Sequence, residues 1–322
     1  MIRLDTIHIE SFNCVKEFEE RYFTLNQKHN PQRQTDYTEY LLINDYRPLG
    51  VSRCALFKNA QMTGLKIKLS AKVLGADYYE LINKNTIEQA IEGLSCDALQ
   101  IDKKAFIDNA RVLSCDSTLN IPVENVQEHI RSLNAVHNPK YRTEPYHAQG
   151  IVFKDKRKTH KERFIFYDKY AELTSSRKAT DKKLLSMLNI DAFKGILRNE
   201  FNLRGFEELQ KYLKIGKDRK LTDALESDAH PNLSFFSGLI PELTVDVITQ
   251  SHKDYKDAVY YQKILEQFNG DFNRAKDFIR SFYEYYPANE IKKLSKVFNN
   301  EIAINESTHI RGLQEAMRLA SV

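Results

Sequence analysis

The stretch Arg163–Glu172, RFIFYDKYAE, decides how the rest of the chain is interpreted. The alternation from Arg163 to Tyr167 is typical of a strand, and Lys169–Leu173 is predicted to begin a helix. The last six of these ten residues hold two tyrosines, one lysine and two carboxylates. Such groups suit a DNA-nicking site, in which a tyrosine attacks, a cation holds a phosphate and carboxylates hold a metal. The alternative is a sheet edge that carries ordinary surface charges.

Two further predicted strands carry acidic residues at a similar depth. Ala110–Ile121 contains Asp116, and Gly195–Leu203 contains Arg198 and Glu200, which are two residues apart and therefore share a face. Glu172 follows the strand of Tyr167. All three elements could direct their carboxylates to one sheet face. Carboxylates that lie close together repel each other unless a cation sits between them. The pattern therefore predicts a metal site formed by Asp116, Glu172 and Glu200.

The order of these motifs resembles the replication-initiator proteins of filamentous phages and related plasmids. An acidic strand (ARVLSCDSTLNI) is followed by a predicted helix at Val123–Leu133, a strand ending in YDKxxE and a strand reading LRxE. Two segments, 69–78 and 82–87, resemble the branch found in Bacteroides-type bacteria. The resemblance covers residues 60–215, about half of the chain, and rests on the order and spacing of short motifs.

This resemblance implies a fold and an activity. Members of the family nick one strand of double-stranded DNA at an origin, stay joined to the 5′ phosphate through a tyrosine, and start rolling-circle replication. The implied fold is α+β, an HUH- or Rep-like nicking domain with a central antiparallel sheet and flanking helices, plus a helical C-terminal region. Many related enzymes carry a His-hydrophobe-His pair, which this chain lacks. Its nearest match is His8-Ile9-Glu10, and we interpret His8 as a strand residue at a sheet edge.

The mechanism implied is metal-assisted transesterification. Tyr167 is the preferred nucleophile because it ends the strand whose neighbours carry the acids, and Tyr170 is the second candidate. Lys169 would stabilise phosphate charge or lower the tyrosine pKa, and Arg198 would hold a non-bridging oxygen, unless each only pairs with a neighbouring acid. Mg²⁺ or Mn²⁺ is the expected cofactor, because the candidate ligands Asp116, Glu172 and Glu200 offer oxygen atoms alone.

A basic run precedes the strand of Tyr167. Residues 154–161 read KDKRKTHK, and a hairpin tip with this charge is predicted to contact DNA phosphates. The expected partner is double-stranded and single-stranded DNA at a replication origin. A solvated loop is an equally good interpretation. The predicted contacts are made by Lys154, Lys156, Arg157, Lys158 and Lys161.

Composition limits the class of protein. The 322 residues carry 48 Lys and Arg against 44 Asp and Glu, and this net charge of +4 is too small to argue for DNA binding. The four cysteines have no metal-binding spacing, and no apolar run reaches the roughly 18 residues of a membrane span. The N-terminus lacks the apolar core of a signal peptide. We therefore expect a cytoplasmic protein with reduced thiols and no membrane segment.

The chain is predicted to divide into a nicking domain, residues 1–226, and a helical domain, residues 239–322. Strands are predicted at Leu4–Ile9, Thr38–Leu42, Val51–Phe57 and Gly64–Leu69. C-terminal helices are predicted at Tyr255–Phe268, Asn273–Tyr286, Asn289–Phe298 and Thr308–Leu319. The aromatic residues of this region are predicted to form a helix-bundle core rather than a base-stacking surface, and a host helicase is a further candidate partner.

Two other functions are also consistent with the sequence. A DNA-binding initiator without chemistry would bind its origin equally with and without metal and leave the DNA intact. A relaxase for plasmid mobilisation would use the same chemistry at a transfer origin. Covalent attachment to DNA separates the first alternative from a nicking enzyme, and genomic context separates the second from a replication initiator.

Overall fold

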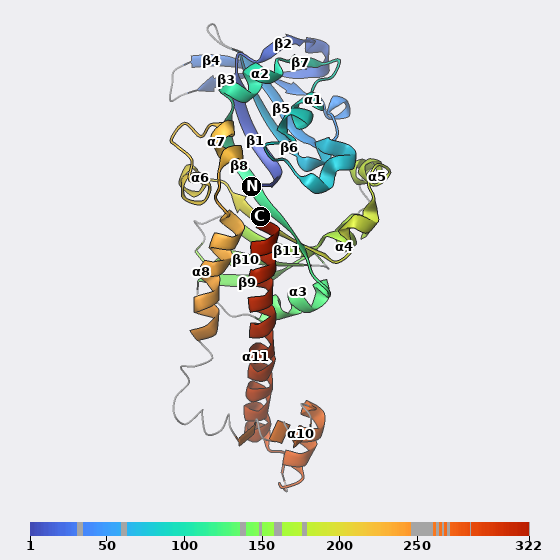
Figure 1. Cartoon of the computed structure of the whole chain (residues 1–322), viewed down its shortest axis with the longest axis vertical. Helices are drawn as coiled ribbons and strands as arrows, with labels where there is room; N and C mark the ends of the chain where they lie inside the picture. The colour runs from blue at the N-terminus through green and yellow to red at the C-terminus, as the bar shows by residue number, and fades with distance from the viewer. Residues whose placement is uncertain are drawn as a thin grey trace.

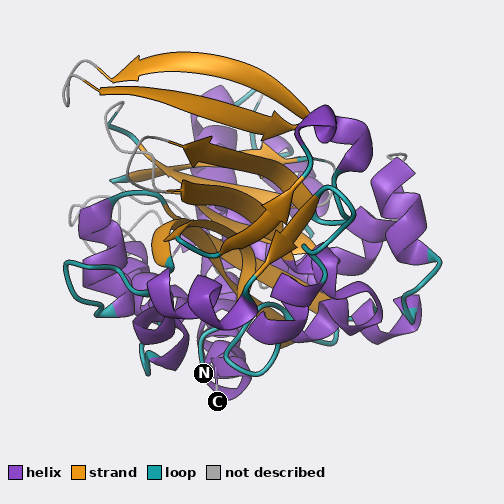
Figure 2. Ribbon diagram, turned by 90° about the horizontal axis from the view of Figure 1, so that it is seen from above, coloured by secondary structure: helices purple, strands orange, loops and turns teal. Residues whose placement is uncertain are grey.

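The computed structural model describes the chain except for residues 31–34, 59–62, 136–139, 148–149, 158–162, 176–178, 246–259, 262–263, 266, 269–270, 284 and 322. Its centre is a large sheet in which every neighbouring pair of strands is antiparallel (Figures 1 and 2). In spatial order its strands are β3 (Phe23–Asn30), β4 (Thr35–Leu42), β5 (Val51–Lys58), β6 (Thr63–Ser70), β1 (Leu4–Phe12), β8 (Arg111–Pro122), β12 (Ile196–Leu203), β11 (Arg163–Asp168), β10 (Gly150–Asp155) and β9 (Tyr141–Tyr146).

A small second sheet pairs β2 (Val15–Phe18) with β7 (Leu99–Ile101). The described part of the chain also contains the 3-10 segments η1 (Glu20–Tyr22), η2 (Asn44–Tyr46), η3 (Ala71–Glu80) and η4 (Ile190–Phe193). The labelled helices are α1 (Ile87–Glu92), α2 (Lys103–Asn109), α3 (Val126–Ala135), α4 (Lys169–Ser175), α5 (Ala179–Leu185), α6 (Phe206–Leu213), α7 (Leu221–Glu226), α8 (Pro231–Val245), α10 (Phe272–Arg280) and α11 (Ala288–Ser321). None of the described helices is long and apolar enough to cross a membrane.

Strand alternation divides the large sheet into an apolar face and a polar face. On β12, Phe201 belongs to the apolar face, whereas Arg198 and Glu200 belong to the polar face. Every residue of β12 is nevertheless buried, so the polar side chains of this strand are held inside the protein. Buried polar groups need hydrogen-bond partners, and these partners build the candidate site.

Helix α8 covers the apolar face. Its Phe235 and Phe236 pack on the rings of Phe164 and Phe201, with centroids 4.7 Å apart for Phe164 and Phe235 and 4.5 Å for Phe201 and Phe235. Asn232, in the first turn of α8, donates to the carbonyl of Ser117 at 3.0 Å and accepts from the Ser117 hydroxyl. The helix is therefore anchored to the sheet by rings and by a buried amide.

The C-terminal region contains one long helix, α11, that runs from α10 back to the large sheet and brings the two chain ends close together (Figure 1). Its Leu313 and Met317 belong to the same hydrophobic core as the sheet. A second, smaller core lies at the other end, where Tyr261 and Ile279 pack with Leu294.

The sequence prediction of a central antiparallel sheet with flanking helices and C-terminal helices is confirmed. The four predicted N-terminal strands are all present, each one to three residues longer at one or both ends. Two helices were expected at 289–298 and 308–319, but one continuous helix spans both. The expected boundary at 227–238 holds the start of α8, in which Pro231 is the first residue. The two-domain division itself stays a prediction.

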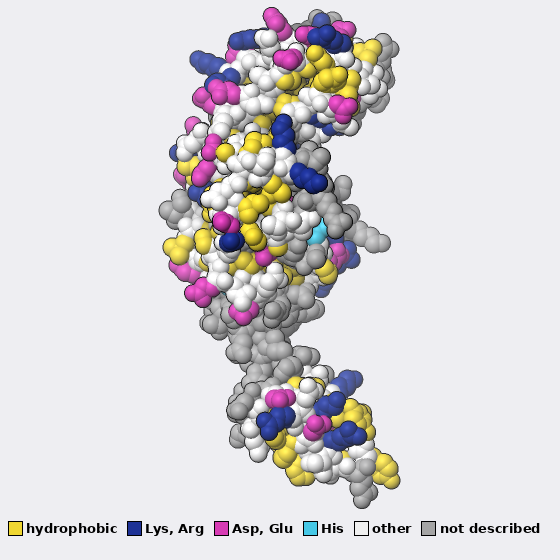
Figure 3. Space-filling model, turned by 90° about the vertical axis from the view of Figure 1, so that its right-hand side faces the viewer, with side chains coloured by type: hydrophobic (Ala, Val, Ile, Leu, Met, Phe, Trp, Pro, Cys, Tyr) yellow, Lys and Arg dark blue, Asp and Glu magenta, His cyan; other side chains and the backbone are white. Residues whose placement is uncertain are grey.

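The prediction that the C-terminal aromatic residues form a helix-bundle core is wrong for most of them. Tyr261 is buried, whereas Phe282 and Tyr285 are 69% and 85% exposed, and Tyr260, Tyr283 and Tyr286 are exposed as well. Figure 3 shows hydrophobic side chains together with Lys and Arg at this end of the molecule. Helix α10 ends at Arg280, so Phe282, Tyr283, Tyr285 and Tyr286 lie beyond the helical repeat that would have buried them.

We predict that removing a buried ring of α8 strongly destabilises the protein. Phe236 is fully buried among Phe164 and Phe166, so Phe236→Ala should lower the free energy of unfolding by about 3–5 kcal/mol. Tyr285→Ala, at an exposed ring, is the control and should change it by less than about 0.5 kcal/mol. Chemical denaturation monitored by circular dichroism measures both values, and equal losses would contradict the assignment of α8 to the core.

Candidate functional site

Three cross-strand rows bring Tyr167, Arg198, Glu200 and Asp116 onto the polar face. The first row joins Tyr167 of β11, Arg198 of β12 and Asn120 of β8, which lie directly opposite one another. The second row contains Glu200 and the third contains Asp116 opposite Asn202. Rows two residues apart share a face, so the register of these strands gathers the side chains of the three rows on that face.

The guanidinium of Arg198 is the centre of the first row and is fully buried. Its Nε donates to Asn120 Oδ1 at 2.9 Å, and its Nη1 donates to Asp5 Oδ1 at 3.0 Å and to the Tyr78 hydroxyl at 2.8 Å. Its carbon Cζ lies 5.1 Å from the centroid of the Tyr78 ring, and the Phe193 ring is close by. Burial opposes the charge, but the acidic groups and phenols around it outweigh burial and raise the pKa of Arg198, so it stays cationic.

A β-bulge explains why Asp5 reaches Arg198. Between Leu4 and Thr6, β1 contains one residue more than β8, and that extra residue is Asp5. A bulge redirects a side chain that would otherwise follow the strand alternation. Tyr78, at the end of η3, also donates to Asp5 Oδ1 at 3.1 Å. The carboxylate therefore holds both the buried cation and the phenol beside it.

A second buried cation, Lys169, starts α4 immediately after β11. Only 2% of its side chain is exposed, and Nζ donates to Glu172 Oε2 at 2.8 Å. The ammonium lies 5.0 Å from the centroid of the Tyr78 ring and 5.5 Å from that of Tyr167. Burial, together with the nearby charge of Arg198, lowers the pKa of Lys169.

Tyr167 and Glu200 form a buried hydrogen-bonded pair. The Tyr167 hydroxyl donates to Glu200 Oε1 at 2.5 Å. Burial, with the charge of Asp5 next in size, raises the pKa of Glu200 to about 7, and burial beside Glu200 raises the pKa of Tyr167 well above its usual value. A carboxylate with a pKa near neutrality can exchange a proton at physiological pH, which is what a general base requires.

The space around Tyr167 depends on a glycine. Gly150 of β10 lies directly opposite Tyr167, and a Cβ at Gly150 would lie 2.6 Å from the Tyr167 Cβ. Beyond the glycine, Tyr146 of the edge strand β9 packs on Tyr167, with ring centroids 5.5 Å apart. Tyr167 is consequently only 4% exposed. Tyr170, the second residue of α4, is half-buried, and its ring centroid lies 5.7 Å from Lys194 Nζ.

The three predicted metal ligands each have a different partner. Asp116 accepts from Asn202 Nδ2 at 2.6 Å, Glu172 from Lys169, and Glu200 from Tyr167. Among the described residues, no group of three or more His, Cys, Asp or Glu side chains is close enough to hold a metal ion. The carboxylates therefore do not fit a shared metal site in this arrangement, and a role for Mg²⁺ or Mn²⁺ stays a prediction.

The basic run before β11 is only partly described, because Lys158 and Lys161 lie outside the described residues. Lys154 pairs with Glu144 of β9, and Arg157 pairs with Asp155 at 2.6 Å. Acidic neighbours thus partly neutralise the positive charge on the described side of this turn. Whether Lys154, Lys156 and Arg157 contact DNA stays a prediction.

Four residues that complete the cluster were missed by the sequence analysis: Asp5, Tyr78, Asn120 and Tyr146. Asp5 reaches the site through a bulge, which alternation cannot reveal. Tyr78 lies in the segment that resembles a family branch, but nothing in its spacing indicates a contact with Arg198. Asn120 had a usable signal, because it follows Asp116 by four residues on the same predicted strand face.

Comparisons with known proteins add little to this geometry. No family model matches the chain, and no curated protein matches its sequence. Among solved structures, a rolling circle replication initiator protein from Geobacillus stearothermophilus is similar over 74% of this chain and 84% of that chain, with 10% identical residues and a TM-score of 0.31. A likeness this distant carries no argument about activity, so any functional conclusion must come from the residues themselves.

The raised pKa of Glu200 predicts how stability depends on pH. Because the folded pKa of about 7 exceeds the ordinary value of 4.5, protonated Glu200 stabilises the folded state fully below pH 4.5, and this stability is lost as the pH rises through about 7. Glu200→Gln retains an acceptor for the Tyr167 hydroxyl and cannot ionise. Between these two pH values the variant should therefore gain on the order of 3 kcal/mol relative to the unsubstituted chain.

Urea unfolding across this pH range measures the difference. Glu207→Gln removes an equivalent charge from the exposed first turn of α6 and should follow the unsubstituted chain. Parallel pH profiles for the Glu200→Gln variant and the unsubstituted chain would show that Glu200 does not titrate in this range.

Proposed function

We propose that this chain is a DNA-nicking enzyme that initiates rolling-circle replication, with Tyr167 as the nucleophile and Glu200 as the group that accepts its proton. The observation that carries the proposal is the hydrogen bond from the Tyr167 hydroxyl to a carboxylate whose pKa is raised to about 7. A nucleophile in contact with a base that titrates near neutrality is the arrangement expected for covalent catalysis. The resemblance of the YDKxxE and LRxE order to replication initiators supports a DNA strand as the substrate.

The proposed reaction is a transesterification. Glu200 takes the proton from the Tyr167 hydroxyl, and the phenolate oxygen bonds to the phosphorus of the scissile phosphodiester. The bond from phosphorus to the 3′ oxygen breaks, and that oxygen takes up a proton, leaving a free 3′-hydroxyl and a 5′-phosphotyrosine. We assign Lys169 and Arg198 to attracting the phosphate, because Lys169 Nζ lies 5.5 Å from the centroid of the Tyr167 ring and Arg198 lies directly opposite Tyr167. Each cation also pairs with an acid, Lys169 with Glu172 and Arg198 with Asp5.

A divalent cation belongs to the proposal only as an expected activator. Asp116, Glu172 and Glu200 are its candidate ligands, and none of the steps above passes through it. Because each carboxylate already has a partner, metal binding would require those hydrogen bonds to rearrange. Nicking should therefore be assayed with Mg²⁺, with Mn²⁺ and with a chelator.

Tyr167 is buried, so the proposed reaction requires that its hydroxyl become accessible to DNA. Tyr167 lies beneath the ring of Tyr146 on the edge strand β9. A DNA strand reaches the hydroxyl only if that ring moves aside, which an edge position permits more readily than a central strand does. Tyr170 is more exposed and is the second candidate nucleophile.

A DNA-binding protein without nicking activity is the second candidate function. The raised pKa of Tyr167 and its low exposure favour it, because an activated nucleophile usually has a lowered pKa and an open path to its substrate. Covalent attachment to DNA separates the two functions, since a binding protein cannot form a phosphotyrosine.

We predict that the protein, incubated with single-stranded oligonucleotides from its own replicon and Mg²⁺ or Mn²⁺, becomes attached to the 5′-phosphate side of the cut. Mass spectrometry of the peptides should find the adduct on Tyr167. Tyr167→Phe removes only the attacking oxygen, so adduct formation should vanish while DNA affinity stays within about twofold.

Tyr170→Phe is the matched control and should form the adduct as the unsubstituted chain does. An adduct that vanishes in Tyr170→Phe and persists in Tyr167→Phe would transfer the nucleophile to Tyr170. Cleavage that survives both substitutions together would sink the tyrosine assignment, and an unsubstituted chain that binds DNA without forming an adduct would favour the second candidate function.

A further inference from the structure

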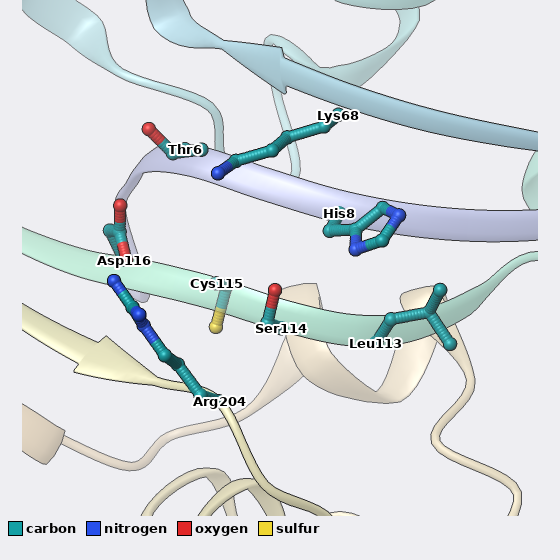
Figure 4. A pocket seen from close by; sticks show the side chains of 8 residues that line it. All are labelled: Thr6, His8, Lys68, Leu113, Ser114, Cys115, Asp116 and Arg204. Carbon is teal, nitrogen blue, oxygen red and sulfur yellow. The ribbon is translucent and has the colours of Figure 1, made fainter. Parts of the chain in front are cut away.

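The polar face of the large sheet contains a cavity away from the Tyr167 row. Its volume is about 330 Å³, and β1, β6, β8 and the end of β12 form its walls (Figure 4). This volume is at the lower end of the roughly 300–1,000 Å³ typical of ligand sites, so the cavity suits a small ligand rather than a DNA duplex. The residues that define its chemistry are Thr6, His8, Lys68, Ser114, Asp116 and Arg204.

Two cations, Lys68 and Arg204, lie on opposite walls of this cavity. Lys68 and Arg204 are exposed at the rim, and neither forms a side-chain hydrogen bond or ion pair among the described residues. Figure 4 shows both side chains extending toward the same end of the cavity, where Thr6 and Asp116 lie. Neighbouring cations on this face are used differently, since Lys66 pairs with Glu10 at 3.3 Å and Arg53 with Glu39 at 3.0 Å.

The charge of the lining favours an anion. Asp116 is held by Asn202 and offsets one of the two cations, while burial and the charges of Lys68, Arg53 and Lys66 lower the pKa of His8 and keep its ring neutral at physiological pH. Lys68 and Arg204 therefore leave a net charge of one positive unit in the cavity. A phosphodiester carries one negative charge and would balance it.

The other end of the cavity suits a nucleobase. The ring of His8 lies there beside Leu113 and Ser114 (Figure 4). Histidine rings stack with unpaired bases, and a hydroxyl such as Ser114 can bond to a base edge. The cavity thus has an anion-binding end and a base-binding end, in the order in which a nucleotide presents its phosphate and base.

We infer that this cavity binds one nucleotide of single-stranded DNA, with its phosphate between Lys68 and Arg204 and its base against His8. The inference rests on the proposed function for its substrate and names where the strand lies. Asp116 is four residues from Asn120 on β8, so the cavity is roughly 13 Å along the strand from the Tyr167 row, at about 3.3 Å per residue. A strand seated in the cavity can therefore extend across the same face toward Glu200 and Tyr167.

Binding can be tested without cleavage. The affinity of a short fluorescein-labelled single-stranded oligonucleotide is measured by anisotropy across a salt series, in the presence of a chelator. The Lys68→Ala, Arg204→Ala double variant should flatten the dependence of log affinity on log salt by about 0.7, because the one phosphate held between these two cations contributes roughly that much on a single strand. His8→Ala should lower affinity by about tenfold and leave the salt slope unchanged.

Lys66→Ala is the matched control, because it removes a lysine two residues along the same strand face that is already paired with Glu10. An unchanged slope in the double variant, or an equal loss in the Lys66→Ala variant, would overturn the inference. Equal losses on the matching duplex would overturn it as well. The measurement involves no cleavage of DNA. The inference about the cavity can therefore be tested even if the unsubstituted chain does not nick DNA, and normal nicking would not by itself support the inference.

Discussion

The buried guanidinium of Arg198 is the interaction on which the rest of the site depends. A fully buried charge is costly unless each of its donors finds a partner, and this requirement connects β1, β8, β12 and η3 through Asp5, Asn120 and Tyr78. The bulge in β1 exists at the position where Asp5 meets that charge. Among the described residues, Nη2 of Arg198 has no partner, so both of its N–H groups can still donate hydrogen bonds to an incoming oxygen.

The two faces of the sheet separate stability from chemistry. Phenylalanine rings and Asn232 attach α8 to one face, and these rings belong to the main hydrophobic core. The opposite face carries Arg198, Glu200 and Asp116 together with the cavity at His8, so substitutions there change charge and hydrogen bonding more than packing. A nucleic acid strand needs such a face, because it must meet cations and hydrogen-bonding groups without displacing the core.

The alternation of apolar and polar residues predicted the strands and the face on which their side chains lie. Alternation located Leu4–Ile9 and Gly64–Leu69, since one buried face repeats every second residue, and it put Arg198 and Glu200 on one face. The join between two expected helices was missed, because a helix of the length of α11 is stabilised by packing at both ends rather than by its caps. Sequence spacing could not predict whether Asp116, Glu172 and Glu200 lie close together. The hydrogen-bond partner of each carboxylate depends on the direction of its side chain in the folded protein.

Charge balance explains why a carboxylate of ordinary type titrates near neutrality in this cluster. Two buried cations, Arg198 and Lys169, already face the carboxylates of Asp5 and Glu172. Ionised Glu200 would add a third negative charge in a place that water does not reach, so it holds its proton to a higher pH than an exposed glutamate would. A site balanced in this way responds to any further charge. The negative charge of a phosphate that enters beside Glu200 would favour the protonated form of this residue. The phosphate would therefore help Glu200 to retain a proton received from Tyr167.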